Sequence, residues 1–201
     1  MNALAISDAV LALVTLVAAI GALAPQPRSA GAVLAAVGGL LLTSAGAIGA
    51  VRYGAVESLA VLHRAVSDLA AAAGLPAVVA GLASALMRRP AIAAGAALGL
   101  SLLMLLVAFG DTALARMLGA LVVLAGAGAL AWAVWQRGHR ALAALCGVAL
   151  LPMLVLAGDR SSEGLTRLHY ALAAAQALWF TAWWQSRRVA ARTTDSEPRF
   201  A

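Results

Sequence analysis

The chain has 201 residues, 64% of them hydrophobic, and a mean hydropathy of +0.95. Soluble domains are nearer to half apolar, so this composition excludes an ordinary soluble enzyme and predicts a polytopic membrane protein in contact with the lipid bilayer. The net charge of +6 comes from arginine alone, since the chain has no lysine. On so apolar a chain this basicity indicates orientation in a membrane, and we expect no nucleic-acid partner.

Apolar segments separated by Gly, Pro and charged breaks predict an all-α bundle of seven transmembrane helices, with eight as the alternative. Their expected ranges are about 6–24, 30–51, 54–89, 91–109, 112–135, 141–157 and 165–185. We expect Ser7 or Asp8 to cap the first helix, which we interpret as retained although Ala22-Leu23-Ala24 resembles a signal-peptidase site. Residues 1–186 are expected to form the bundle, and residues 187–201 a disordered, basic cytoplasmic tail.

The number of crossings depends on residues 54–89, which contain a Gly74-Leu75-Pro76 interruption. As one kinked helix, this stretch is longer than the hydrocarbon core of a bilayer. As two helices, the second is too short to cross comfortably. The charge distribution favours a single crossing, because with eight crossings acidic and basic residues would lie at the same end of the bundle.

Basic residues are concentrated at one predicted end of the bundle. The positive-inside rule places that end in the cytoplasm and the N-terminus outside. The arginines concerned are Arg28, Arg88, Arg89, Arg137, Arg140, Arg187, Arg188, Arg192 and Arg199. The tryptophans expected to form an aromatic belt at this boundary are Trp132, Trp135, Trp183 and Trp184. Abundant Ala and Arg without Lys is typical of GC-rich bacterial genomes, so we expect a bacterial inner (plasma) membrane.

Small residues recur at four-residue spacing, as in Ala35 and Gly39, and in Gly95 and Gly99. Such pairs allow two helices to approach closely. We interpret them as packing positions inside the bundle, with a homo-oligomer or a membrane partner protein as the alternative.

Glu57, Arg64 and Asp68 are spaced i, i+7 and i+11, which places them on one face of a helix. Charges facing lipid are costly, so this face should meet the bundle interior or the outer interface. The alternative is a purely structural Arg64–Asp68 ion pair. His63 points away from this face and is expected to be a hydrogen-bonded packing residue.

The last predicted helix carries a second polar face. His169, Gln176 and Trp183 follow one another at seven-residue spacing, and Tyr170 is adjacent. A buried His and Gln on one face either line a cavity or bond to another helix.

Asp111 and Asp159 are candidates for a polar outer rim. Each precedes a predicted helix, as Asp8 does, and carboxylates at such positions cap backbone amides and suit the helix dipole. Capping alone is therefore our preferred interpretation of these three acids.

The sequence supports metal or haem binding only weakly, and the candidate ligands are His63 and His169. They come from different predicted helices and have no HxxxH, HExxH or CxxC spacing. Phosphate-binding glycine loops and a GxSxG nucleophile motif are absent from the sequence. Neither the cofactor nor an enzyme class follows from the sequence.

Three functions remain open. The leading hypothesis is a binding protein that holds a small molecule, a lipid headgroup or a metal in an outer-half pocket between the third and seventh helices. Its candidate residues are Glu57, His63, Arg64, Asp68, His169, Tyr170 and Gln176. The alternatives are a lipid hydrolase that uses a histidine with an acid or a metal-bound water, and a structural or accessory subunit of a membrane complex.

Overall fold

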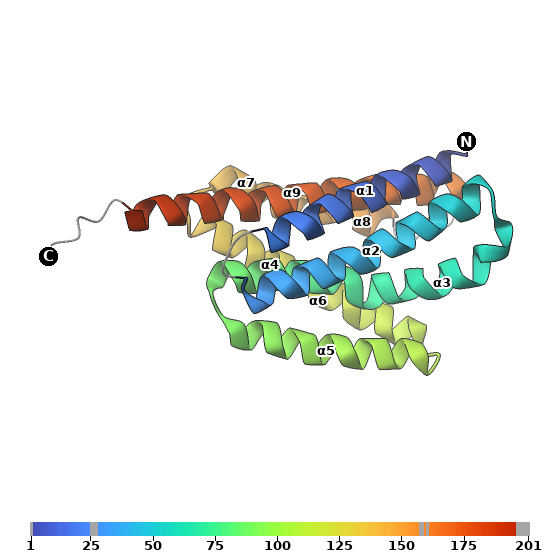
Figure 1. Cartoon of the computed structure of the whole chain (residues 1–201), viewed down its shortest axis with the longest axis horizontal. Coiled ribbons are helices and arrows are strands. Elements are labelled where there is room, and N and C mark those ends of the chain that lie inside the picture. The colour runs from blue at the N-terminus through green and yellow to red at the C-terminus, as the bar shows by residue number, and fades with distance from the viewer. Residues whose placement is uncertain (1, 25–27, 157–158, 160, 196–201) are drawn as a thin grey trace, which may run out of the picture.

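The computed structural model describes residues 2–24, 28–156, 159 and 161–195, and all regular structure in these residues is helical. The elements are α1 (Ala3–Leu23), α2 (Ala30–Gly54), a 3₁₀ turn (Glu57–Leu59), α3 (Ala60–Leu69), a π turn (Ala70–Gly74), α4 (Leu75–Met87), α5 (Pro90–Ala108), α6 (Thr112–Trp135), α7 (Arg140–Val148), α8 (Leu150–Leu156) and α9 (Ser162–Asp195). They run up and down as one elongated bundle (Figure 1). The expected features at residues 25–27, Arg160 and Arg199 lie outside the described residues.

Five helices are long and apolar enough to cross a membrane: Ala3–Leu23, Ala30–Gly54, Glu57–Met87, Ala91–Ala108 and Thr112–Trp135. The predicted all-helical, multi-pass architecture is therefore confirmed at this level. A shorter apolar helical stretch, Arg140–Leu156, is interrupted at Ala149 between α7 and α8. Pro152 lies four residues after Val148 and cannot donate to its carbonyl, which explains why α7 ends there.

The central stretch forms one continuous helical span from Glu57 to Met87. The alternative of two separate helices, broken at Gly74–Pro76, is therefore wrong. Proline has no N–H and its ring clashes with the carbonyl four residues earlier. The π turn Ala70–Gly74 ends two residues before Pro76 and widens the helix at this point, so the chain continues into α4 without a break.

Helix α2 lies between α1 and α4, and glycines bring it close to both. A Cβ on Gly46 would stand 2.7 Å from the Asp8 carbonyl oxygen of α1. A Cβ on Gly81 of α4 would stand 2.5 Å from the Ala35 nitrogen of α2. Gly95 and Gly99 of α5 differ, because nothing lies within 4 Å of a Cβ at either position. The prediction of packing inside the bundle is wrong for this pair, which faces outward.

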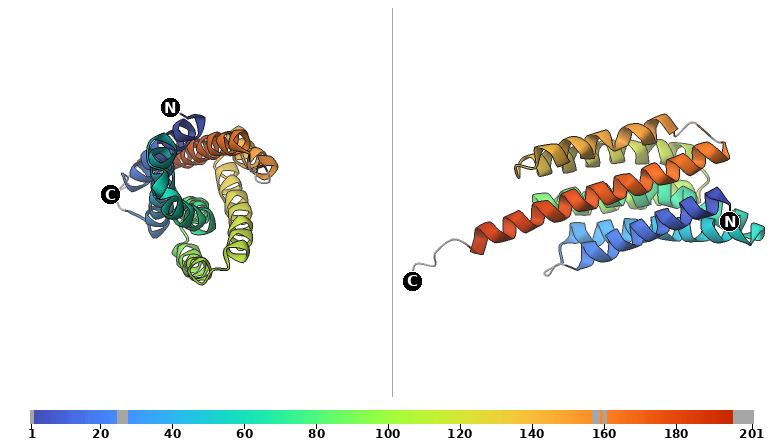
Figure 2. Two further views of the ribbon diagram at one scale, coloured as in Figure 1. Left: turned by 90° about the vertical axis from the view of Figure 1, so that its right-hand side faces the viewer. Right: turned by 90° about the horizontal axis from the view of Figure 1, so that it is seen from above.

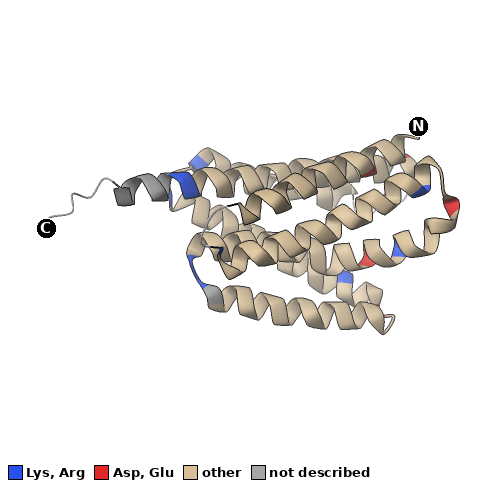
Figure 3. Cartoon of the chain, in the orientation of Figure 1, with Lys and Arg blue, Asp and Glu red and all other residues tan. Residues whose placement is uncertain are grey.

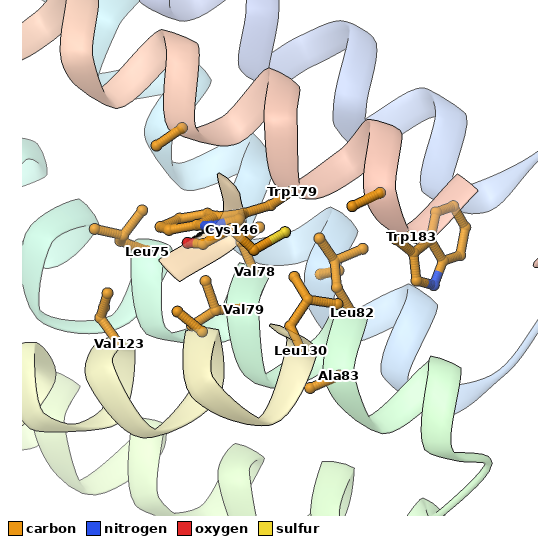
Figure 4. Close-up of a cluster of buried hydrophobic side chains, with 14 of the residues drawn as sticks. Leu75, Val78, Val79, Leu82, Ala83, Val123, Leu130, Cys146, Trp179 and Trp183 are labelled. Atoms are coloured by element: carbon orange, nitrogen blue, oxygen red, sulfur yellow. Dashed lines mark hydrogen bonds between the residues drawn. The ribbon is translucent and has the colours of Figure 1, made fainter. Parts of the chain in front are cut away.

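The main hydrophobic core joins α4, α6, α7 and α9 (Figure 4). Trp179 and Trp183 of α9 are fully buried against the leucines and valines of α4 and α6. The Trp179 indole Nε1 donates to the Cys146 carbonyl oxygen at 3.0 Å, at the end of α7 where the helix is interrupted. Trp132 and Trp135 are exposed as a membrane-boundary belt requires, whereas Trp183 is a core residue and the belt prediction is wrong for it.

The two ends of the bundle differ in what they carry. One end has the N-terminus, the α2–α3 and α5–α6 connections and the start of α9, and the other has the α4–α5 and α6–α7 connections and the end of α9 (Figure 1). Basic residues mark the second end, but several also lie toward the first (Figure 3). Helix α9 continues to Asp195, so the tail expected to be disordered is helical as far as that residue.

At the second end, Arg137 joins the last turns of two helices. Its guanidinium donates to the Leu86 carbonyl of α4 and, at 2.9 Å, to the Ala133 carbonyl of α6. Burial, and then the neighbouring Arg88 cation, hold the pKa of Arg137 below its usual value.

Candidate functional site

A cavity of about 440 Å³ lies among α1, α2, α3, α6, α8 and α9, toward the end of the bundle that carries the N-terminus. Most of its lining is aliphatic, from residues such as Leu11, Leu42, Val123, Met153 and Leu172. Its polar lining consists of Asp8, Tyr53, His63, Ser67, Asp68, Arg116 and His169. The end-on view shows the helices that surround it (Figure 2, left).

Asp8 is the most deeply buried charged group of this lining, with 2% of its surface exposed. The prediction that Ser7 or Asp8 caps the first helix is wrong. Helix α1 begins at Ala3, and the side chain of Asn2 caps it by accepting from the Leu4 amide at 2.9 Å. Asp8 is therefore inside the helix, more than a turn from its start, and faces the bundle interior.

His169 of α9 binds Asp8 directly, since its Nδ1 lies 2.8 Å from Asp8 Oδ1. Ser7 Oγ lies 3.3 Å from the same Nδ1 and donates its own proton to the Leu4 carbonyl. An ionised carboxylate can only accept, so Nδ1 carries the imidazole proton. Within the described residues Nε2 of His169 makes no hydrogen bond, and it is the ring atom left available to the cavity.

His63 of α3 lies on the other side of Asp8. The Arg52 guanidinium is 3.0 Å from His63 Nδ1, and because arginine can only donate, Nδ1 accepts and Nε2 carries the proton. Arg52 also stacks over the Tyr53 ring, whose edge meets the His63 ring in a T-shaped contact. His63 is thus hydrogen-bonded and packed by neighbours on α2, as expected, and it also lines the cavity.

Gly49 of α2 packs closely against both Asp8 and His63. A Cβ on this residue would stand 2.7 Å from His63 Nε2 and closer still to Asp8 Oδ2. Any other residue at position 49 would therefore collide with both polar groups. Asp8 Oδ2, which lies beside Gly49, is buried and has no hydrogen-bond partner among the described residues.

Asp68 and Arg116 form a second charged group in the cavity lining, with 3.8 Å between Arg116 Nη1 and Asp68 Oδ1. Arg116 is held in place by hydrogen bonds to the backbone and side chain of Thr112, one turn earlier on α6. The expected Arg64–Asp68 pair is not formed, because Asp68 pairs with Arg116 and Arg64 is exposed. Both partners are partly exposed, so this pair contributes at most about 1 kcal/mol to stability.

Three other candidates lie away from the cavity. Glu57 is exposed in the 3₁₀ turn, and Tyr170 is 44% exposed on the outer face of α9. Gln176 is buried on the same face of α9 as His169, but it adjoins a separate small void beside α1 and α2. The structure therefore brings together His63, Asp68 and His169 of the predicted set, and adds Asp8 and Arg116.

The two outer-rim acids lie at helix starts. Asp111 caps α6 by accepting from the Leu114 amide at 3.2 Å. Asp159 accepts from the Ser161 amide at 2.9 Å, just before α9. Hydrogen bonds from the Ser161 side chain and backbone hold the pKa of the exposed Asp159 carboxyl below its usual value. The capping prediction is therefore confirmed for Asp111, whereas the Ser161 hydroxyl caps α9 by accepting from the Gly164 amide at 2.9 Å and Asp159 bonds to the residue before the helix. Neither acid lines the cavity.

A metal site is not formed by the part of the chain that the structure describes, where no group of three or more His, Cys, Asp or Glu side chains could hold an ion. His63 and His169 flank Asp8, but the directional bonds of both Nδ1 atoms are already used by Arg52 and Asp8.

The cavity is open on one side of the bundle. Helices α6 and α8 both contribute to its lining, yet they are not among the helix pairs that pack closely. Leu124 of α6 and Leu154 of α8, both in the lining, are exposed. In a bilayer, this side faces the lipid chains, so an apolar molecule could enter from the membrane without crossing water.

No protein-family model and no curated protein matches the sequence, and no solved structure matches the fold.

Proposed function

We propose that this chain is a multi-pass membrane protein that binds an amphipathic small molecule of lipid-like shape in the cavity between α1, α3, α6 and α9. The apolar part of the ligand lies along the leucines and valines of α2, α6 and α8, and its polar end lies against Asp8, His63 and His169. This proposal keeps the predicted outer-half pocket between the third and seventh predicted helices, which correspond to α3 and α9. It replaces Arg64 and Glu57 by Asp8 and Arg116.

The observation that carries the proposal is a largely aliphatic cavity of about 440 Å³ with a buried carboxylate at its polar end. Ligand sites typically have volumes of roughly 300–1,000 Å³ and combine an apolar lining with a few convergent polar groups. Ionisable residues at membrane depth are costly, and they usually serve a binding or transport pathway.

The proposed orientation has seven crossings, with the N-terminus outside and the C-terminus in the cytoplasm of a bacterial inner membrane. In support, Arg88, Arg89, Arg137 and Arg140 all lie at the end of the bundle opposite the cavity. The ligand site then belongs to the outer half of the membrane.

The test is to ask what co-purifies with the full chain in mild detergent. Ala120→Trp places an indole in the cavity from α6. Gly128→Trp is the matched control on the same helix, because nothing lies within 4 Å of a Cβ at that position. We expect mass spectrometry to find one enriched lipid-like species with the wild type and with Gly128→Trp, and its loss in Ala120→Trp. Equal retention by all three proteins would contradict the proposal.

A hydrolase is the second candidate, and one specific observation favours it. The Asp8–His169 pair fixes the imidazole proton on Nδ1 and leaves Nε2 available to the cavity, which is the arrangement of a general base that can activate water. If it acts so, His169→Gln abolishes turnover of a bound ester lipid, and Asp8→Asn lowers it by a factor on the order of 10²–10⁴. An enzyme retaining its turnover after either substitution would exclude this mechanism.

A further inference from the structure

Basic residues gather at the end of the bundle opposite the cavity (Figure 3), and three of them come from three different helices. Arg88 ends α4, Arg137 follows the end of α6, and Arg187 lies in the last part of α9. Burial, and then the Arg88 cation, hold the pKa of both Arg137 and Arg187 below its usual value. The charge of Arg88 therefore acts on both of the others, and like charges at short range repel one another.

Carboxylates do not offset this repulsion in the part of the chain that the structure describes. The ion pairs formed there are Arg116–Asp68, Arg167–Glu163 and His169–Asp8, none of which includes an arginine of this cluster. Arg137 donates to two helix-end carbonyls, as described above. Arg88 is exposed and Arg187 is partly exposed, and neither forms a hydrogen bond or ion pair with a described residue. Their guanidinium groups are thus accessible to a ligand from outside.

The backbone at Arg88 is held in place from the core by Ser84 of α4, which is 1% exposed. The Ser84 carbonyl accepts from the amides of both Arg88 and Arg89, and the Ser84 hydroxyl donates to the Arg89 carbonyl at 2.9 Å. Arg88 has a φ of 55°, the left-handed conformation that glycine usually supplies where a helix ends. An arginine thus occupies a position where glycine would be less strained, on a corner that is fixed by hydrogen bonds.

Arg187 is positioned by an aromatic ring. Its guanidinium carbon lies 5.2 Å from the centre of the Trp183 ring, and Trp183 is fully buried in the main core. A guanidinium stacked on an aromatic face keeps its N–H edges free to bind carboxylate or phosphate oxygens in pairs. The cluster therefore presents planar donor groups whose positions are set by rigid neighbours.

We propose that Arg88, Arg137 and Arg187 bind the phosphate of an anionic phospholipid headgroup at this end of the bundle. The depth of the cluster favours a lipid over a free anion. Arg88 and Arg137 come directly after the membrane-compatible spans Glu57–Met87 and Thr112–Trp135, where headgroups lie in a bilayer. Basic pockets between helix ends at this depth are typical binding places for phosphate-bearing headgroups. This site is separate from the cavity and does not rest on the function proposed for it.

The test compares two lipids that share their acyl chains and differ in headgroup charge. Phosphatidylglycerol is anionic, whereas phosphatidylcholine carries a compensating ammonium group. Native mass spectrometry of the full chain in mild detergent counts bound lipid during a titration. An arginine near an anionic headgroup contributes roughly fivefold in affinity, so with two accessible arginines we expect phosphatidylglycerol to bind roughly 10- to 30-fold more tightly than phosphatidylcholine.

Single substitutions locate the site. Arg88→Gln and Arg187→Gln should each weaken phosphatidylglycerol binding roughly fivefold and leave phosphatidylcholine binding unchanged. Arg137 is left intact, because its bonds to the ends of α4 and α6 also support the fold. Arg140→Gln is the matched control, since it removes the same charge at the same end from a residue that stacks on Trp135. We expect it to change phosphatidylglycerol binding little.

Three results would overturn the proposal. Equal binding of the two lipids would show that the cluster does not select an anionic headgroup. A loss in Arg140→Gln as large as in the two site variants would show general attraction by positive charge, without a site. Displacement of phosphatidylglycerol by added inorganic phosphate would assign the cluster to a free anion, whereas retention of the lipid supports the proposal. Should Arg88→Gln not fold, Arg187→Gln and the ranking of lipids by the wild type still decide the matter.

Discussion

His169 Nδ1 lies 2.8 Å from Asp8 Oδ1, and this contact joins the last long helix of the bundle to the first. Asp8 is almost completely buried, whereas His169 is only partly buried. His169 can therefore present its ring to the cavity while Asp8 fixes the position of that ring. The same contact thus closes the bundle and orients the site.

Removing His169 should destabilise the protein, because it leaves a buried carboxylate without its partner. We expect His169→Leu to lower the free energy of unfolding by about 3–5 kcal/mol, measured by chemical unfolding in detergent. Tyr170→Phe, next to it on the exposed face of α9, should have little effect. Adding Asp8→Leu to His169→Leu should recover part of the loss. Wild-type stability in the single variant would show that the pair contributes nothing to the fold.

Adding one methyl group at the α2–α4 contact should also be costly. A Cβ on Gly81 would stand 2.5 Å from the Ala35 nitrogen, where backbone atoms cannot easily move aside. We expect Gly81→Ala to lower stability by roughly 1–3 kcal/mol, seen as a lower thermal midpoint. Gly99→Ala is the control, since its Cβ would meet nothing within 4 Å. Equal midpoints for the two variants would contradict the close approach of α2 and α4.

How far the sequence predicts this structure depends on whether a feature is local. The ends of most helices and the Asp111 cap follow from Gly, Pro and carboxylate positions close by in the chain. The shared face of His169 and Gln176 follows from spacing within one helix. These features need no knowledge of neighbouring helices.

The site itself depends on contacts between helices, which the sequence does not display. Asp8 is misassigned as a cap because Asn2 starts α1 several residues earlier than the apolar pattern indicates. The Asp68–Arg116 pair joins α3 to α6 and has no local signal. The local sequence feature that indicates this site is Asp8, an ionisable residue next to a long apolar run.

Trp179 should be the most sensitive core residue. Its indole fills the space among α4, α6 and α7, and its N–H satisfies the Cys146 carbonyl (Figure 4). We expect Trp179→Ala to cost about 3–5 kcal/mol of stability. Trp179→Phe keeps most of the volume and loses the hydrogen bond, at about 1 kcal/mol. Equal losses in the two variants, measured by denaturant unfolding, would show that volume does not dominate this position.

The proposed orientation can be checked by cysteine labelling of intact cells in a Cys146→Ser background. Ser58 is exposed in the turn between α2 and α3, and Gln136 is exposed between α6 and α7 at the opposite end. We expect Ser58→Cys to react with a membrane-impermeant maleimide from outside. Gln136→Cys should react only after the cells are opened. The reverse pattern would turn the whole bundle over and move the cavity to the cytoplasmic half.

The π turn Ala70–Gly74 has a consequence for how this helix can tolerate change in length. A π turn holds one residue more than an α-helical turn, so it takes up a surplus residue while the helix faces before and after it stay nearly in phase. Deleting a single alanine from the Ala70–Ala73 run would restore regular α-helix and leave His63 and Asp68 directed toward Asp8 and Arg116. Inserting a further alanine that is not taken up in this way would rotate α3 by about 100° relative to α4 and turn both side chains away. This segment should therefore tolerate the loss of one residue better than the gain of one.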